Sequence, residues 1–385
     1  MSVLLLILGL ILFIGLVIVH EFGHFLVARR NGVKVEEFGI GFPPRAWGKK
    51  LKSGLFLSIN WLPLGGFVRL KGESDSDTEP GSFGAASLWV KTKIMAAGVV
   101  MNLLAAFVIL TFLALVGLPK MVDNQFTVKS DTTIASNRVI IGYVEPGSPA
   151  DKAGLKEGDH LISFASPETV SCLSLDCPPA GKVAVTNQEQ LPLITAQFAG
   201  QPVDVSYKRK GEVKTTIANL RSGEEVEQSK KTDNPKGYLG ISPNEYTLLR
   251  STWSAPIVAG GLIKQFTVMT FQGLGHAISA LFAGRTSEAS DQVAGPVGVF
   301  VILKDSSLLG YQYILAIIAI ISLTLAIMNA LPIPALDGGR LFVTWLFRAM
   351  RKPLTKSTEQ RIHATGFMLL MLLFVVITIV DVRRF

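Results

Sequence analysis

The stretch Ile18-Val19-His20-Glu21-Phe22-Gly23-His24 lies within the first long apolar segment of the chain. Because residues four apart share one face of an α-helix, His20 and His24 can offer two imidazole nitrogens to one zinc ion. Glu21 stands next to them as a candidate base that takes a proton from the attacking water. Ionisable groups in so apolar a segment are costly unless they serve a function. The stretch therefore predicts a zinc-dependent hydrolytic site inside a membrane helix.

The composition around this stretch is that of a membrane protein. The chain has 385 residues, of which 49% are hydrophobic, and a net charge of +8. Many of the Lys and Arg residues lie in short segments beside apolar runs, where cations set the orientation of a membrane protein. We therefore attribute the basic charge to membrane topology and predict a lipid bilayer, not a nucleic acid, as partner.

Four apolar segments are long enough to cross a bilayer, at residues 2–28, 94–116, 308–328 and 362–380. Clusters of Lys and Arg follow the first segment and separate the third from the fourth, which predicts that both clusters are cytoplasmic and both termini lie outside. His24 then lies near the cytoplasmic face. Asn102, a polar residue of the second segment, is expected to hydrogen-bond another helix and to take no part in catalysis.

Residues 54–71 are too apolar for an ordinary cytoplasmic loop, lack a helical period and carry Pro63 and the pair Gly65-Gly66. They predict a β-hairpin that dips towards the membrane. Such a hairpin could offer an edge strand to an unwound substrate, which would bind by adding a strand to the sheet. A packed hairpin without a substrate role is the alternative. The acidic run at residues 73–79 lacks EF-hand spacing, so we expect a solvated linker and not a calcium loop.

Residues 127–243 have the composition of a soluble domain, which would face the extracytoplasmic space. The motifs Gly147-Ser148-Pro149-Ala150, Ala153-Gly154-Leu155 and Gly158-Asp159 resemble those of bacterial PDZ domains. By that resemblance, Tyr238, Leu239, Gly240 and Ile241 form the loop whose backbone N–H groups receive peptide C-termini.

Two further segments complete the expected organisation. Residues 166–186 read as an insertion into the PDZ-like pattern, and Cys172 and Cys177 within it could form one local disulfide. Residues 253–282 are apolar but interrupted by polar residues, which favours an amphipathic helix at the outer surface over another span. The expected parts are two membrane regions at 1–118 and 308–385, the PDZ-like domain at 127–243 and an interfacial region at 250–305.

Two histidines need a third protein ligand before zinc keeps an open position for water. The best supplier is the stretch 329–340, Asn-Ala-Leu-Pro-Ile-Pro-Ala-Leu-Asp-Gly-Gly-Arg, whose two prolines should break the third span near the cytoplasmic face. Asp337 then reaches the depth of the two histidines. It could instead cap a helix that begins at Gly338.

His20-Glu21-Phe22-Gly23-His24 in a first span, a distant Leu336-Asp337-Gly338-Gly339 and a PDZ-like domain between spans together resemble the site-2 protease family of intramembrane zinc metalloproteases. The order of these parts resembles its bacterial branch, of the regulator of sigma-E protease type. The resemblance implies one zinc per chain at His20, His24 and Asp337, with Glu21 as catalytic base. It also implies that Asn329 contacts the substrate backbone and that Gly65, Gly66 and Phe67 belong to a membrane re-entrant hairpin. Asn329 could instead satisfy carbonyls freed by the nearby proline.

The fold implied is a polytopic α-helical membrane protein with a membrane-associated β-hairpin and an inserted extracytoplasmic PDZ-like α+β domain. The function implied is cleavage of single-span membrane proteins, such as an anti-sigma factor, in the bacterial inner membrane after a first cut outside it. The sequence departs from the family's pattern at two points: one PDZ-like unit is evident where relatives have two, and Val99 stands where that branch commonly has proline. The alternatives are a non-proteolytic PDZ-bearing scaffold and a zinc membrane protease that acts on soluble or prenylated peptides.

Overall fold

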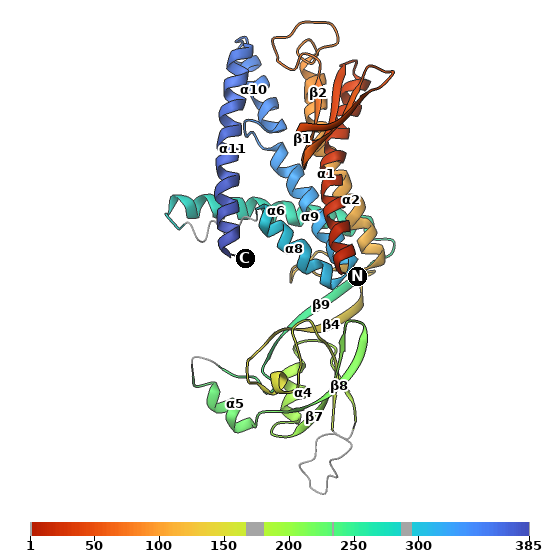
Figure 1. Cartoon of the computed structure of the whole chain (residues 1–385), viewed down its shortest axis with the longest axis vertical. Coiled ribbons are helices and arrows are strands. Elements are labelled where there is room, and N and C mark those ends of the chain that lie inside the picture. The colour runs from red at the N-terminus through yellow and green to blue at the C-terminus, as the bar shows by residue number, and fades with distance from the viewer. Residues whose placement is uncertain (1, 167–180, 233–234, 286–294, 385) are drawn as a thin grey trace. The chain divides into compact units, whose positions relative to one another are not determined.

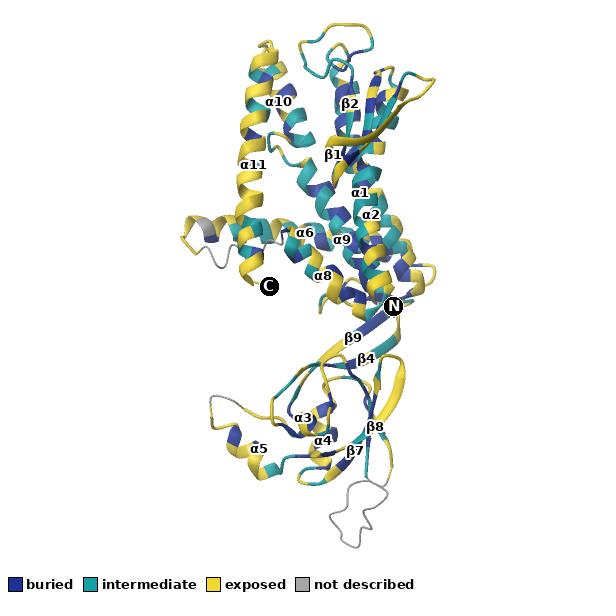
Figure 2. Ribbon diagram, in the orientation of Figure 1, coloured by how far each residue is buried: buried dark blue, intermediate teal, exposed yellow. Residues whose placement is uncertain are grey.

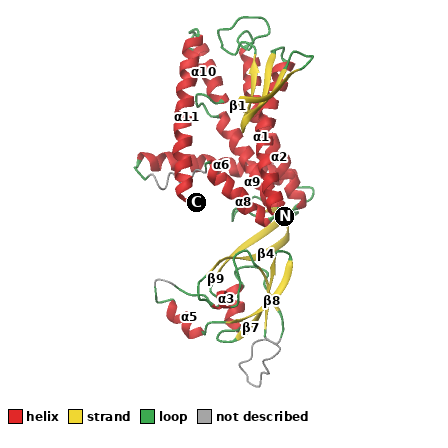
Figure 3. Cartoon of the chain, in the orientation of Figure 1, coloured by secondary structure: helices red, strands yellow, loops and turns green. Residues whose placement is uncertain are grey.

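The computed structural model describes residues 2–166, 181–232, 235–285 and 295–384, which belong to two compact units. The helical unit comprises Met1–Leu118, Asn124–Thr132 and Ser251–Phe385, and the strand unit comprises Pro119–Asp123 and Thr133–Arg250. Figure 3 shows that the helical unit also carries one small sheet, whereas strands dominate the other unit. The chain is therefore a polytopic helical protein with a separate β-rich unit.

Four helices are long and apolar enough to cross a membrane, which confirms the four expected spans. They run over Val3–Arg30, Leu88–Val116, Tyr311–Ala330 and Lys356–Arg384. The helices of this unit are α1 (Ser2–Arg30), α2 (Leu88–Val116), α6 (Ala255–Phe282), α8 (Pro296–Leu309), α9 (Tyr311–Ala330), α10 (Asp337–Ala349) and α11 (Lys356–Arg384), shown in Figure 1.

Local capping explains where two of these helices begin. α2 starts earlier than the apolar run because Ser87 caps it, accepting a hydrogen bond from the Val90 N–H. α9 starts at Tyr311, later than the predicted 308, because Gly310 adopts φ +122° and separates it from α8. Polar turns and glycine breaks, not hydropathy, thus set these boundaries.

α1, α2 and α9 pack against one another and form the core that holds the candidate site. α1 and α2 approach closely because small residues face each other: a Cβ at Gly23 would come within 2.6 Å of the Ala97 carbonyl oxygen. On the other side, the Ser322 hydroxyl of α9 donates a hydrogen bond to the Asn102 carbonyl oxygen at 2.8 Å. By contrast, α11 is exposed along most of its length (Figure 2), as suits an apolar helix that faces lipid.

α6 is a single helix over the segment for which we expected an amphipathic, interfacial structure. It contacts α2 and α9 and runs across them (Figure 1). It does not reach the apolarity of the four candidate spans within the described residues. Its place at the membrane surface remains a prediction, which this crosswise course supports.

The small sheet is a hairpin of two long, bent strands, β1 (Val35–Lys50) and β2 (Phe56–Leu70). Residues 37–40 of β1 pair with residues 56–59 of β2 on one side and with residues 66–69 on the other. The hairpin expected within 54–71 is therefore too short, since that stretch forms mainly the second strand. The first strand escaped prediction because a Pro43-Pro44 pair and several glycines interrupt its strand pattern.

Glu37 contacts three other segments of this bent sheet, which we call its arms: residues 45–50, 56–60 and 66–70. Its buried carboxylate accepts a hydrogen bond from the Ser58 hydroxyl at 2.6 Å and forms ion pairs with Arg45, at 3.3 Å, and with Arg69. These three partners lie on the other arms of the sheet. A buried carboxylate is tolerated when it is paired and hydrogen-bonded in this way, and here one side chain connects its own arm with three others.

The strand unit is built on a seven-stranded sheet, counted over the described residues, in the order β3-β9-β4-β5-β7-β8 with β6 paired to β5. Phe164 and Phe198 are among the largest side chains of its buried core. The strands are β3 (Leu118–Pro119), β4 (Thr133–Val144), β5 (His160–Ala165), β6 (Val183–Ala184), β7 (Pro202–Arg209), β8 (Glu212–Asn219) and β9 (Ile241–Arg250), joined by the short helices α3 (Pro149–Lys152), α4 (Leu191–Gln197) and α5 (Gly223–Ser229).

Two of the PDZ-like motifs contact each other in this unit. The Ala150 N–H donates to the Leu239 carbonyl oxygen at 3.0 Å, and Ser148 caps α3. Gly240 has φ +75°, and a Cβ there would come within 2.3 Å of the Ser148 side chain, so only glycine fits. The PDZ assignment itself remains a prediction. Cys172 and Cys177 lie outside the described residues, and so does the expectation of a disulfide.

Candidate metal centre

Three side chains from two distant parts of the chain meet in the helical unit. His20 Nε2 lies 3.0 Å from Asp337 Oδ2, and His24 Nε2 lies 3.1 Å from the same oxygen. The two Nε2 atoms are 3.1 Å apart. Both histidines are buried, and Asp337 is partly buried. The structure thus brings together the three residues that the sequence proposes as metal ligands.

The break between α9 and α10 carries Asp337 to the histidines. α9 ends at Ala330, ahead of the two prolines, and α10 begins with Asp337 itself. The N-cap residue of α10 is Leu336, and no side chain caps this helix. Because the Asp337 carboxylate faces His20 and His24, its geometry favours the ligand role over the capping role.

The charge state of Asp337 suits a ligand. Burial alone raises the pKa of this carboxyl group, but the two imidazoles that face it outweigh burial and hold the pKa below its ordinary value. The carboxylate is therefore ionised near neutral pH, the form that binds a metal.

The donor set fits zinc. The three donor atoms are 3.0–3.1 Å apart, close to the roughly 3.3 Å that separates ligands of a tetrahedral zinc with bonds of about 2.0–2.1 Å. Gly98 of α2 lies against this triangle, and a Cβ there would come within 2.5 Å of Nε2 of both His20 and His24. Because glycine has no side chain, Gly98 leaves room for the three donor atoms and for a metal ion between them.

α2 also contacts the ring nitrogens that point away from Asp337. The Ile94 carbonyl oxygen lies 2.7 Å from His24 Nδ1, and the Asn102 amide lies 3.3 Å from His20 Nδ1. The expected helix contact of Asn102 exists through its backbone, but its side chain reaches the candidate site, which the sequence interpretation missed. The signal was present: residues 94, 98 and 102 share one face of a helix.

Glu21 lies on the side of the site that faces the small sheet. A Cβ at Gly66 would come within 3.3 Å of Glu21 Cγ and 3.7 Å of Val17. Gly66 pairs with Ile40, and no further strand pairs with residues 66–69 in the part of the chain that the structure describes. The predicted hairpin residues therefore lie at an edge of the sheet beside the predicted base.

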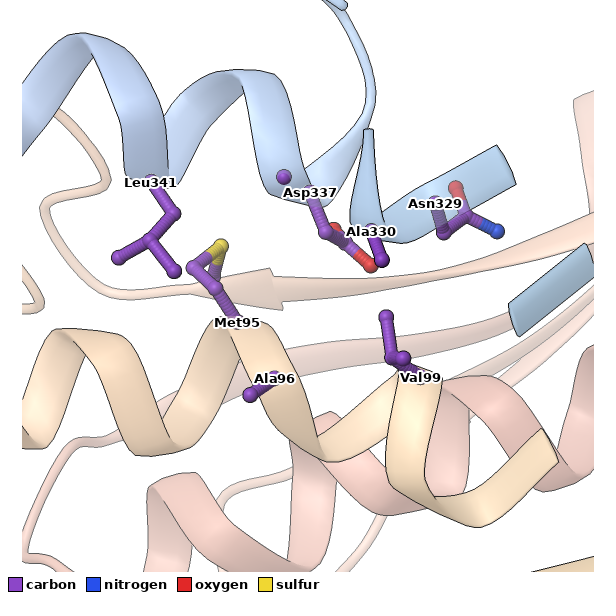
Figure 4. Close-up of a pocket in the computed structure, with 8 residues that line it drawn as sticks. Met95, Ala96, Val99, Asn329, Ala330, Asp337 and Leu341 are labelled. Carbon is purple, nitrogen blue, oxygen red and sulfur yellow. The ribbon is translucent and has the colours of Figure 1, made fainter. Parts of the chain in front are cut away.

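A cavity of about 130 Å³ opens next to Asp337 between α2, α9 and α10 (Figure 4). Asn329 lines it, so the structure places this predicted substrate contact beside the centre. Val99, the residue that departs from the family's pattern, lines it too. The remaining wall is apolar and consists of Met95, Ala96, Ala330, Gly338 and Leu341.

Arg340, one turn after Asp337, connects α10 to the segments around it. Its guanidinium donates to the Glu73 carbonyl oxygen and lies 3.8 Å from the Glu359 carboxylate of α11. Asp75 forms an ion pair with Lys91, which is fully buried at the start of α2. The expectation of a solvated linker is therefore wrong for Asp75, which pairs with a buried residue of α2, whereas Glu73 contacts α10 through its carbonyl oxygen and keeps a partly exposed side chain.

Comparison with known proteins gives matches along nearly the whole chain. Residues 8–373 match the model of peptidase family M50. A protein of Clostridium perfringens that is named as a zinc metalloprotease is 31% identical over 97% of each chain. Zinc metalloprotease RasP of Shouchella clausii and regulator of sigma-W protease RasP of Bacillus subtilis are each 26% identical over 97% of both chains. The matched region contains all residues of the candidate centre.

Proposed function

Because this chain belongs to peptidase family M50 and is a zinc metalloprotease of the site-2 type, we propose that it hydrolyses peptide bonds within the spans of single-span membrane proteins. The observation that carries this proposal is the triangle of His20, His24 and Asp337 at helices apolar enough to cross a membrane. His20 and His24 lie on α1, a helix that can cross a membrane, so substrates would reach the site through the bilayer. Because the chain belongs to a protease family, the alternative of a non-proteolytic PDZ-bearing scaffold is not favoured.

We assign a chemical role to each residue of the centre. Bound zinc supplies the Lewis acidity that makes water a nucleophile near neutral pH. His20, His24 and Asp337 hold the metal. Glu21 takes a proton from the attacking water and returns it to the leaving amine. Its position beside the triangle, next to the edge of β2, supports this role.

A substrate must be unwound before it can be cut, because the hydrogen bonds of a helix shield its peptide bonds. Residues 66–69 of β2 offer backbone groups beside Glu21 to an extended segment, which would add to the sheet as a further strand. Asn329 offers an amide next to Asp337 for the same backbone. Val68 and Leu70 of this strand also pack in a hydrophobic core with residues of α1 and α2, which fits the alternative of a packed hairpin without a substrate role.

The side chains of the sheet support its insertion into the membrane. Phe42 pairs with Leu62 where both strands bend, and Phe42, Trp61 and Leu62 are exposed there. Basic side chains lie towards the other end, at Lys49 and Lys50. Exposed aromatic and apolar groups suit lipid, whereas the lysines suit the cytoplasmic interface.

The strand unit, in this proposal, is an extracytoplasmic PDZ-like domain that selects substrates already shortened by a first cut. Peptide C-termini would bind at Tyr238, Leu239, Gly240 and Ile241, which precede and open β9. A relative is named regulator of sigma-W protease, and by that analogy we propose an anti-sigma factor as a substrate in the bacterial inner membrane.

Mapping the cut tests the proposal. The purified protein is incubated in lipid vesicles with a single-span substrate and, separately, with a short peptide that carries the residues around the cut and added lysines for solubility. We expect mass spectrometry to place the cut within the apolar span, and we expect cleavage to stop on chelation and to return with zinc. Faster cleavage of the soluble peptide would contradict the proposal and favour the protease that acts on soluble or prenylated peptides.

Val99 should set the size of the substrate side chain that the cavity accepts. An apolar cavity of about 150 Å³ holds a benzene molecule, so about 130 Å³ suits an aliphatic side chain. Val99→Phe should fill it and lower cleavage of a substrate with Leu beside the cut, relative to one with Ala, by roughly tenfold or more. Val100→Phe is the matched control because Val100 is exposed on the same helix. An unchanged Leu-to-Ala ratio in Val99→Phe would show that the cavity does not receive this side chain.

A further inference from the structure

We infer that Asn102 is a positioning residue for His20: its side-chain oxygen accepts a hydrogen bond from Nδ1–H of His20 and thereby leaves Nε2 free to bind zinc. This inference rests on the proposed zinc site. It concerns a residue of α2 that neither binds the metal nor touches the substrate in the roles assigned above.

His24 shows what such an arrangement requires. Its Nδ1 lies 2.7 Å from the Ile94 carbonyl oxygen, which can only accept a hydrogen bond. Nδ1 of His24 must therefore carry a proton, so in the neutral ring Nε2, which faces His20 and Asp337, has the lone pair that a metal needs. A backbone carbonyl thus fixes one of the two ligands in the form that binds a metal.

His20 faces the same requirement with a different partner. Its Nε2 is turned to Asp337 and His24, and its Nδ1 is turned to the Asn102 side chain at 3.3 Å. If the amide nitrogen of Asn102 donated to Nδ1, the proton of neutral His20 would sit on Nε2 and block coordination. The ligand role of His20 therefore requires an acceptor from Asn102, not a donor.

The amide oxygen of Asn102 is available for this purpose. Asn102 is 1% exposed, and its Oδ1 has no hydrogen-bond partner among the described residues. Amide oxygen and nitrogen are assigned from their hydrogen bonds, so a rotation of the amide by half a turn is a legitimate arrangement of the same side chain. That rotation lets the buried Oδ1 accept a hydrogen bond from Nδ1–H of His20, and it moves Nδ2 to a position with no hydrogen-bond partner among the described residues.

The surroundings hold Asn102 in place for this contact. The Ser322 hydroxyl of α9 donates to the Asn102 backbone carbonyl at 2.8 Å, so α2 and α9 are joined at this residue. Gly98, one turn earlier, packs against the imidazoles on the same face of α2. α2 thus supports both histidines, through Ile94 for His24 and through Asn102 for His20.

Zinc affinity of the purified full chain tests the inference, measured by competition with a chelator of known affinity. Asn102→Leu keeps the size of the side chain but removes the acceptor, and it should weaken zinc binding by roughly 10–100-fold. Asn102→Asp keeps an acceptor and should retain affinity close to wild type. Thr111→Val removes a hydroxyl of α2 that bonds only to the Phe107 carbonyl of the same helix, and it should bind zinc as wild type does.

Each alternative predicts a different set of zinc affinities for these variants. If Asn102 served helix packing alone, Asn102→Asp would bury a charge and lose as much zinc affinity as Asn102→Leu, which would overturn the inference. Wild-type affinity in Asn102→Leu would overturn it as well. NMR of the zinc-loaded wild type and of Asn102→Leu gives a second readout: the Nδ1–H proton of His20 should resonate further downfield in the wild type, where Asn102 accepts its hydrogen bond, and equal shifts would contradict the inference. Unchanged zinc affinity in His20→Ala would instead refute the proposed site.

Discussion

Replacing Glu21 with glutamine should abolish cleavage of the single-span substrate while the protein still binds one zinc. Glutamine has nearly the same shape as glutamate but cannot accept a proton from water. General base catalysis contributes typically about 10²–10⁴-fold, so the rate should fall by a factor in that range. Zinc should stay because the ligand triangle consists of His20, His24 and Asp337. Initial rates and metal analysis of the same preparation measure the two effects together.

Glu36→Gln is the matched control for this variant. Glu36 is an exposed residue of β1 next to the buried Glu37, so the same chemical change there should leave cleavage unchanged. Retention of more than about one tenth of the wild-type rate in Glu21→Gln would refute its role as the base, because that loss falls short of the range for this catalysis. Loss of zinc in Glu21→Gln would show that Glu21 supports the metal and not only the proton transfer.

The meeting of His20, His24 and Asp337 was predictable because local rules place each of these residues. His20 and His24 share a helix face wherever the helix lies, since the spacing alone decides it. The break before Asp337 follows from the two prolines, which cannot continue a helix. The equal depth expected for these two pieces in the membrane then predicted that they meet, although they are far apart in the sequence.

The partners of the centre depend on packing and could not be predicted in the same way. The contact of Asn102 with His20 exists only because Gly23 and Gly98 allow α1 and α2 to approach closely and turn this face of α2 towards α1. Residues 94, 98 and 102 visibly share one face of α2, but nothing within α2 indicates that this face meets the two histidines of α1. The sequence interpretation therefore assigned Asn102 to helix packing, when its side chain also reaches a ligand.

The first strand of the small sheet escaped prediction for a different reason. Strand signals rely on uninterrupted alternation, whereas residues 35–50 contain Pro43, Pro44 and glycines at 39, 41 and 48. Those glycines are needed once the sheet is folded: a Cβ at Gly39 would come within 2.4 Å of the Phe67 ring. The glycines that interrupt the strand pattern in the sequence are therefore the residues that allow the arms of the sheet to pack closely.

Replacing Asp337 with alanine should remove zinc from the purified protein and, with it, all cleavage. The carboxylate is one of three donors, and the two histidines that remain cannot hold zinc as tightly. Changes to groups that merely support a ligand cost roughly 10–100-fold in metal affinity, so the loss of a ligand should exceed about 100-fold. Chelator competition measures the affinity, and metal analysis gives the content of the protein as purified.

Asp305→Ala separates this effect from a general effect of losing a carboxylate in the helical unit. Asp305 is exposed on α8, so its replacement should leave zinc affinity and cleavage unchanged. Wild-type zinc content in Asp337→Ala would return Asp337 to the capping role at the start of α10 and would leave the centre without its third ligand. Because His20 and His24 would then form an incomplete donor set, the same result would refute the proposed metal site as a whole.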